Sequence, residues 1–298
     1  MSDALQIQVK VAATPEKVYQ ALMDAAALRA WFAEDAEVTP THYNFWGRYT
    51  HSTPDRANGQ HPILVNEPNK RLQYRWQIND LETTVQFDLL ERDGQTLVVM
   101  TQSDGEKWSP WLTEDFWFLS LENLRRYAEG KRSDMRVDYT VSPTGDAHIE
   151  IEIDAPPSDV FPILIKPEQL RRWIASNPSV EPVVGGAYDF GWGTSPMKIL
   201  ELKENERLVV SDPDTNTVAT WTLEGAGGKT RLTLVHSGFA PDYDNTGLKH
   251  GWRNFLNWIR GIAEEGSAWE SPIKQIKEDL YPMYPATIRQ RQAELALK

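Results

Sequence analysis

Apolar and polar residues alternate in two segments that lie far apart along the chain. Residues 7–11 carry Ile, Val and Val at every second position, and residues 149–153 carry three Ile in the same way. A period of two is typical of a strand with one buried face. Each segment is soon followed by a proline, Pro15 or Pro157, at the start of a helical pattern. Since Pro is favoured at the first position of a helix, each segment predicts a strand that leads directly into a helix.

These segments begin an internal repeat. Trp31 and Trp173 close the opening helices of the two copies, and their offset (173 − 31 = 142) is also that of Pro15 and Pro157. Aromatic, alternating strand patterns follow at Tyr43–His51 and Ala187–Trp192, and several further strands follow in each copy. A repeat of this length indicates two copies of one domain.

Each copy ends in an apolar stripe at helical spacing, which predicts a long amphipathic helix. The stripes comprise Trp117, Leu121, Leu124 and Ala128 in the first copy, and Trp252, Phe255, Leu256 and Ile259 in the second. Between the copies the chain is polar, with a short strand predicted at Met135–Val141. Prolines at 272 and 285 predict two short helices after the repeat. We therefore expect domains at residues 1–140 and 141–266 and a helical tail at 267–298.

Composition narrows the possible partners. The 298-residue chain has 43 acidic and 31 basic residues, a net charge of −12, and no cysteine. Phosphate binding relies on clustered Lys and Arg, so the charge argues against nucleic acid and anionic membranes as partners. Lack of cysteine excludes disulfides and thiolate metal sites, and the histidines show no metal-ligand spacing. With no signal peptide or membrane-spanning apolar run, we expect a cytoplasmic protein without metal or cofactor.

A set of spaced residues in the second copy resembles a known family. The set is Ala155, Pro157, Val160, Phe161, Leu170, Trp173, Gly185, Gly186, Tyr188, Trp221 and residues 234–239. In these positions the copy is similar to the C-terminal domain of the activator of the 90-kDa heat-shock protein ATPase, within the START and Bet v 1-like superfamily. The first copy matches at fewer positions and has Gln102 where the second has His236.

This resemblance implies an α+β fold of two tandem helix-grip domains, each a curved antiparallel sheet wrapped on a long C-terminal helix. It also implies a function, because members of the superfamily bind lipids, steroids, polyketides or other hydrophobic molecules between the sheet and the helix, and some are enzymes. The eukaryotic co-chaperone has a different N-terminal domain, whereas this chain has a second helix-grip copy.

Interior-facing aromatic residues and two histidines are the candidate ligand-binding residues. They are Tyr49, His51, Trp76, Phe87 and Trp117 in the first copy, and Tyr188, Phe190, Trp221, His236 and Trp252 in the second. Small-molecule pockets are mostly apolar with a few polar anchors, which fits this set. The alternative is that these side chains simply fill two well-packed cores.

His236 is the candidate with chemical reactivity. It shares strand parity with Leu232 and Leu234, so we expect the imidazole to face the interior. A histidine needs a carboxylate or metal partner for acid–base work, and no such partner lies nearby in sequence. A core histidine held by hydrogen bonds is the alternative.

Three functions remain open at this point. We expect non-catalytic binding of a small hydrophobic molecule in a cavity between the sheet and the long helix. One alternative is an interaction protein related to chaperone ATPase activation, with a chaperone as its partner. The other is a cyclase-like or hydrolase-like enzyme that uses His236 together with a carboxylate from another strand.

Overall fold

The computed structural model describes residues 4–103, 110–175, 177–269, 271 and 273–275. The chain forms two compact units, each considered by itself below. Unit 1 contains the described residues up to Val141 together with residues 273–275, and unit 2 contains the described residues from Ser142 to Ser271.

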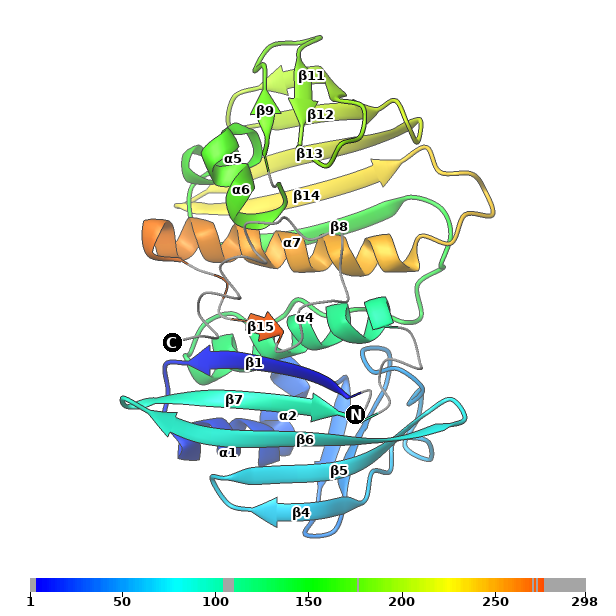
Figure 1. The fold of residues 1–298 in the computed structure, drawn as a ribbon, viewed down its shortest axis with the longest axis vertical. Coiled ribbons are helices and arrows are strands. Elements are labelled where there is room, and N and C mark those ends of the chain that lie inside the picture. Colours follow the sequence, from blue (N-terminus) through cyan, green and yellow to red (C-terminus); the bar gives the residue numbers. More distant parts are fainter. Residues whose placement is uncertain (1–3, 104–109, 176, 270, 272, 276–298) are drawn as a thin grey trace. The chain divides into compact units, whose positions relative to one another are not determined.

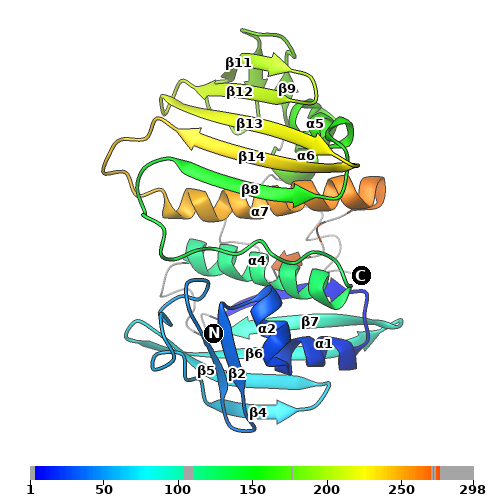
Figure 2. The same ribbon diagram turned by 180° about the vertical axis from the view of Figure 1, so that it is seen from behind.

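Unit 1 is an antiparallel sheet with helices packed on one face (Figures 1 and 2). Its elements are β1 (Leu5–Val11), α1 (Pro15–Met23), α2 (Ala25–Trp31), β2 (Asp35–Val38), β3 (Tyr43–Trp46), β4 (Ile63–Glu67), β5 (Arg71–Ile78), β6 (Leu81–Arg92), β7 (Gln95–Gln102), α4 (Pro110–Ala128) and β15 (Ile273–Gln275). The sheet order is β15-β1-β7-β6-β5-β4, and β2 and β3 form a separate hairpin. Helices α1 and α2 both contact the long helix α4.

Unit 2 repeats this arrangement (Figures 1 and 2). Its elements are β8 (Ala147–Ile153), α5 (Pro157–Ile165), α6 (Pro167–Trp173), β9 (Ser179–Val180), β10 (Ala187–Asp189), β11 (Met197–Lys203), β12 (Arg207–Asp212), β13 (Thr217–Ala226), β14 (Lys229–Ser237), α7 (Thr246–Glu265) and a 3-10 turn (Gly266–Ala268). The sheet order is β8-β14-β13-β12-β11-β10-β9. Each unit therefore has the predicted α+β fold, with a sheet packed against a long C-terminal helix.

The sequence patterns explain how each unit begins. In β1, alternate residues are buried, and Ile7, Val9 and Val11 are each 0% exposed. Helix α1 begins at Pro15, and the Thr14 side chain caps it by accepting a hydrogen bond from the Lys17 backbone N at 3.4 Å. The predicted strand and helix starts are therefore confirmed.

Equivalent hydrogen bonds tie the two long helices to the first strands. The side chain of Glu129, directly after the end of α4, accepts from the backbone N of Ala12 at 3.0 Å, and Glu264 of α7 accepts from that of Asp154 at 3.1 Å. These contacts hold each long helix at the end of the first strand of its own unit.

Two predicted elements differ from the structure. Residues 135–141 form no strand, because the Met135 carbonyl is bound by the Asn123 side chain and the Tyr139 backbone N donates to the Arg48 carbonyl, rather than to a neighbouring strand. Residues 273–275, predicted to lie in a helix, form β15, which pairs antiparallel with β1. The edge of β1 offers backbone groups for pairing, and β15 satisfies them. The second predicted tail helix lies outside the described residues.

Candidate functional site

A chain of hydrogen bonds joins the long helix of unit 1 to its sheet. The Trp117 Nε1 of α4 donates to Gln102 Oε1 of β7 at 2.6 Å. Gln102 Nε2 donates to Thr83 Oγ1 of β6 at 3.1 Å, and that hydroxyl donates to the Trp76 backbone carbonyl at 2.7 Å. The side chains of Thr83, Gln102 and Trp117 are at most 1% exposed. The chain thus pairs polar groups that would be costly to bury alone.

Unit 2 has the same chain with a histidine in place of the glutamine. Trp252 Nε1 of α7 donates to His236 Nδ1 of β14 at 3.1 Å, and His236 Nε2 lies 2.8 Å from Thr217 Oγ1 of β13. A ring nitrogen that accepts from an indole N–H carries a lone pair. The proton of the neutral imidazole is therefore on Nε2, which donates to Thr217.

The two chains of bonds occupy equivalent places in the repeat. Gln102 and His236 differ by 134 positions (236 − 102), and so do Thr83 and Thr217 (217 − 83). The prediction that Gln102 stands where the second copy has His236 is therefore confirmed. An amide and a neutral imidazole can both accept from an indole and donate to a hydroxyl, which explains the exchange.

The surroundings of His236 favour its neutral form. Burial lowers the pKa of His236 below its ordinary value, and the nearby carboxylates of Asp212 and Asp146 oppose that shift to a smaller extent. Among the described residues neither carboxylate hydrogen-bonds to the imidazole, whose two nitrogens are taken by Trp252 and Thr217. Asp212 is the carboxylate from another strand that an acid–base pair would need, but the geometry leaves the imidazole no unoccupied nitrogen.

Aromatic side chains that are partly open to solvent surround this histidine. The ring centroids of Phe239 and Trp252 lie 4.8 Å and 5.9 Å from that of His236. Tyr243 stacks on Phe239 at 5.4 Å and is 49% exposed. On the inner side, Trp252 contacts the buried Trp221 at 5.4 Å. Aromatic contacts thus lead from the surface to the core, and we call these five residues, together with Thr217, the His236 group.

Sequence reasoning found His236, Trp221 and Trp252 in this group but missed Phe239 and Tyr243. Both follow the end of β14, where a strand-parity argument no longer applies. Gly238 has φ +93°, a conformation that L side chains rarely adopt, and it turns the chain so that Phe239 comes back to His236. The glycine at the end of the strand, two positions after the inward-facing His236, is the signal that could have located Phe239.

In unit 1 the corresponding interior contains larger side chains. Leu72 pairs with Phe87, as Leu208 pairs with Trp221, so β5 corresponds to β12. Tyr74 and Trp76, both 0% exposed, then correspond to Val210 and Asp212 two and four positions further along. Unit 2 therefore has smaller side chains at two interior positions near its hydrogen-bonded chain.

The unit 1 candidates Trp76, Phe87 and Trp117 lie together in the core. Trp117 contacts Phe87 at 5.8 Å and Trp76 at 6.2 Å between ring centroids, both edge to face. Each of the three is at most 1% exposed. The structure thus brings these candidates together as a buried aromatic cluster.

Tyr49 and His51 lie elsewhere in unit 1. Strand β3 ends at Trp46, and Gly47 has φ +103°, so the alternating strand predicted over Tyr43–His51 stops before these two residues. Tyr49 lies between the guanidinium groups of Arg48 and Arg136, at 4.9 Å and 4.3 Å from its ring centre.

The ring partner of His51 is Tyr139, at 5.2 Å. Burial lowers the pKa of His51 to about 4. Tyr49 and His51 therefore contact residues 136–139, the segment that follows the long helix.

Tyr188 and Phe190 have different counterparts from the predicted ones. Tyr188 faces Val180 in the β9–β10 hairpin as Tyr43 faces Val38 in the β2–β3 hairpin. The repeat therefore matches Tyr43 and Phe45 to Tyr188 and Phe190. Tyr188 donates to the Leu164 carbonyl at 2.6 Å and contacts Phe190 at 5.3 Å. Both side chains are buried in the hairpin and helix packing of unit 2.

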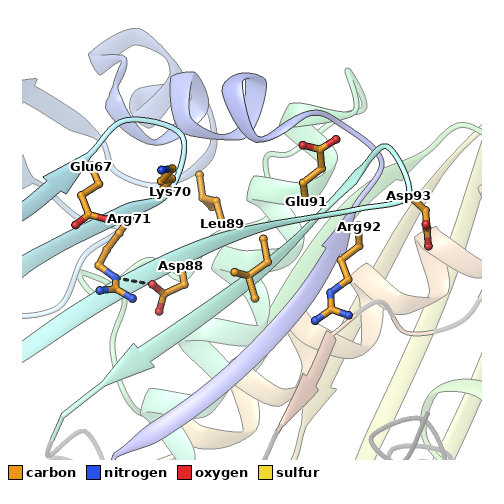
Figure 3. A pocket seen from close by; sticks show the side chains of 9 residues that line it. Glu67, Lys70, Arg71, Asp88, Leu89, Glu91, Arg92 and Asp93 are labelled. Carbon is orange, nitrogen blue, oxygen red and sulfur yellow. Dashed lines mark hydrogen bonds and ion pairs between the residues drawn. The ribbon is translucent and has the colours of Figure 1, made fainter.

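Two surface grooves occur in unit 1, and both are lined mainly by polar or charged side chains. The one in Figure 3 is lined by Glu67, Lys70, Arg71, Asp88, Leu89, Leu90, Glu91, Arg92 and Asp93. Its charges are mixed, and Arg71 pairs with Asp88 at 2.6 Å across two strands. The other groove is lined by Glu37, Thr39, His42, Asn44, Arg56, Ala57 and Gln60, with Arg56 paired to Glu37. Neither groove is lined by any of the ligand-binding residues predicted from the sequence.

The chain matches the model of a known protein family. The family model for activator of Hsp90 ATPase homolog 1-like proteins matches residues 12–129 and 154–264, one match in each unit. The chain therefore belongs to this family and contains two copies of its domain. No curated protein matches the chain.

Several solved structures are similar in fold. The Aha1 dimer of Colwellia psychrerythraea is 21% identical, with a TM-score of 0.38 over 42% of this chain and all of that chain. A protein of the dynemicin biosynthetic locus is 19% identical, with a TM-score of 0.37 over 89% of this chain and 99% of that one. An Hsp90 activator from Plasmodium falciparum is 21% identical, with a TM-score of 0.35 over 39% and 94%.

In the described part of the chain, no group of three or more His, Cys, Asp or Glu side chains could hold a metal ion. None of the helices described is both long enough and apolar enough to cross a membrane.

Proposed function

We propose that unit 2 binds a small hydrophobic molecule at the His236 group, without catalysing a reaction on it. The observation that carries this proposal is the series of aromatic contacts from the half-exposed Phe239 and Tyr243 inward to Trp221, with a polar anchor beside them. Small-molecule sites are typically apolar and aromatic, with few polar groups that fix orientation.

Side-chain size supports placing the site in unit 2. Val210 and Asp212 stand where unit 1 has Tyr74 and Trp76, so the sheet of unit 2 carries less bulk on its inner face. Interiors are close-packed, so smaller side chains at these two positions require other groups, which a ligand could supply, to fill the space. The Asp212 carboxylate and the His236 imidazole would supply polarity at one end of the bound molecule.

Binding is favoured over catalysis by the bonding of His236. Both ring nitrogens are engaged, and burial lowers its pKa, which keeps the imidazole neutral. A general base must have a nitrogen available to the proton that it abstracts. The equivalent Gln102 makes the same bonds without any titratable group.

Native mass spectrometry of the gently purified full chain tests the proposal directly. We expect an added mass that is released on denaturation, or, with the dye 8-anilinonaphthalene-1-sulfonate as a probe, a saturable site. Tyr243→Ala should weaken that binding about tenfold, which corresponds to roughly 1.4 kcal/mol, without changing the melting temperature. Tyr19→Ala is the matched control, since Tyr19 is half-buried on α1 of unit 1 and bonds to Asn66. Equal binding by both variants and the wild type would refute the site.

Family membership favours a second candidate function, contact with a chaperone of the Hsp90 class, because both units match a family named for activation of that ATPase. The test is whether the full chain changes the ATPase rate of such a chaperone at micromolar concentrations. No change in rate and no co-sedimentation would remove this candidate and leave the ligand proposal standing.

A further inference from the structure

Among the buried polar atoms of unit 1 that have no hydrogen-bond partner in the described part of the chain, three belong to neighbouring rings. They are His61 Nε2, Tyr74 OH and Trp76 Nε1. Their side chains are at most 1% exposed. An unpaired buried polar group is costly, and most such groups in folded proteins have a partner from protein or from bound solvent.

These atoms belong to one cluster of rings around Phe45. The Phe45 centroid lies 4.0 Å from His61, 6.0 Å from Tyr74 and 5.1 Å from Trp76. The His61 ring is also 6.2 Å from Tyr74 and 6.1 Å from Trp76. Tyr74 and Trp76 are two residues apart on β5, so they share one face of the sheet.

The protonation states of the cluster are neutral. Burial lowers the pKa of His61 to about 3, and backbone hydrogen bonds with Phe45 and Arg75 oppose this to a smaller extent. A neutral imidazole keeps a lone pair on one ring nitrogen, so Nε2 can accept a hydrogen bond when Nδ1 carries the proton. Burial, with a smaller contribution from Tyr43, raises the pKa of Tyr74 well above its ordinary value, so the phenol keeps its proton.

The three atoms therefore offer complementary hydrogen-bonding roles. Trp76 Nε1 is a donor only, His61 Nε2 can accept in the tautomer protonated on Nδ1, and Tyr74 OH can be either. A hydroxyl group matches this set, because its oxygen accepts from the indole while its proton goes to the imidazole. A carboxylate or ammonium group would lack a counter-charge in the cluster.

We propose that unit 1 holds a small, neutral hydroxyl compound, either water or an alcohol, bound by His61, Tyr74 and Trp76 beside Phe45. The site is distinct from the His236 group, because the unit 2 positions that correspond to Tyr74 and Trp76 are Val210 and Asp212. Buried waters typically make about three hydrogen bonds to otherwise unpaired groups, which is the number offered here.

Removal of the Tyr74 hydroxyl tests the site, because a paired and an unpaired hydroxyl predict different changes in hydrogen-exchange protection. If the hydroxyl bonds to a guest, Tyr74→Phe in the full chain should lower the hydrogen-exchange protection of the β5 and β6 amides by about 5–30-fold. If the hydroxyl is truly unpaired, its removal leaves protection unchanged or raises it, and the proposal fails. Tyr188→Phe is the matched control, because that buried hydroxyl has a known partner, the Leu164 carbonyl at 2.6 Å. It should lower protection in unit 2 by a similar factor and leave β5 and β6 unchanged.

A high-resolution crystal structure of the full chain provides the second measurement. Density within hydrogen-bonding distance of at least two of the three atoms is expected, and its absence would overturn the proposal whatever Tyr74→Phe does. Native mass spectrometry then identifies the source. An added mass lost in the Tyr74→Phe variant but kept in Tyr243→Ala indicates an alcohol in unit 1, whereas density without added mass indicates water. A mass lost only in Tyr243→Ala belongs to the His236 group and leaves this site to be judged on the density and exchange results.

Discussion

The two units contain the same chain of hydrogen bonds, but solvent reaches it only in one of them. In unit 1, Thr83, Gln102 and Trp117 are at most 1% exposed, whereas in unit 2 His236 and Trp252 are half-buried and Tyr243 beside them is 49% exposed. The bond from the long helix to the sheet is preserved through a change from Gln to His. The comparison indicates that the polar geometry belongs to the fold, and that the side chains around it determine access.

The difference in bulk has an energetic consequence. Burial of apolar surface stabilises a fold by roughly 25 cal/mol per Å², and unit 1 buries the large rings of Tyr74 and Trp76 completely. Unit 2 has Val210 and Asp212 at those positions and gains less. Binding sites commonly cost stability, so the smaller side chains at these two positions of unit 2 agree with the proposal that it binds a ligand.

The largest effect is expected where the two units are alike. Trp31 and Trp173 are at most 1% exposed, and each indole donates to a backbone carbonyl, that of Ala21 at 2.9 Å or Ile163 at 3.0 Å. Replacing either with Ala should lower the free energy of unfolding of its own unit by about 3–5 kcal/mol, the range for large aromatic truncation in a core. Unfolding of the full chain by guanidinium chloride measures this loss of stability. Amide hydrogen exchange then shows which of the two units is destabilised. A variant that melts normally but binds ligand differently would assign that indole to a site.

A smaller loss of stability should differ between the two units. Trp117→Phe and Trp252→Phe each remove one indole N–H and keep an aromatic ring. In unit 1 this leaves Gln102 Oε1 buried without its donor, at a cost of about 1–3 kcal/mol. In unit 2, His236 is half-buried, so its Nδ1 can accept a hydrogen bond from water when the indole N–H is removed. We therefore expect a loss of stability of about 1 kcal/mol or less.

The same denaturant titration compares the two variants, with the loss of ring volume common to both. Equal costs for Trp117→Phe and Trp252→Phe would mean that solvent does not reach the hydrogen-bonded chain of unit 2. The contrast between the units would then be lost.

Much of the fold could be predicted from local patterns. Strict alternation in β1 and Pro15 after a capping Thr14 define a strand and a helix whatever the rest of the chain does. The repeat then supplied the second unit and the match between Gln102 and His236. The strand and helix signals are local along the chain, and the repeat is a match between two parts of it. Both kinds of signal can be recognised in the sequence.

Other features depend on contacts that sequence patterns do not record. The backbone turns at Gly47, so Tyr49 and His51 contact residues 136–139 instead of continuing the strand predicted over Tyr43–His51. Strand β15 forms because the β1 edge is available, although Pro272 looks like a helix start. The partners of His236 come from two distant elements, α7 and β13, and only the folded chain brings them together.

The smallest predicted effect is a pH dependence specific to unit 2. Because burial lowers the folded-state pKa of His236 below 6.5, the unfolded chain binds a proton more readily than the folded chain. Stability should therefore fall as the pH drops below about 6.5. Protonated His236 can no longer accept from Trp252, so the loss should be about 1 kcal/mol, the net contribution of one hydrogen bond.

His236→Gln should remove this dependence while keeping both bonds, as Gln102 does in unit 1. Unfolding of the wild type and the variant by urea at pH 7.5 and 5.5 measures it, and the difference between the proteins cancels the contributions of His51 and His61, which are common to both. If the two proteins lose equal stability between these pH values, His236 does not titrate as proposed. Ligand binding at pH 7.5 should be nearly unchanged in the variant. A general base at this position would instead lose about 10²–10⁴ in rate, so any turnover that disappears with His236→Gln while binding persists would replace the binding proposal with an enzymatic one.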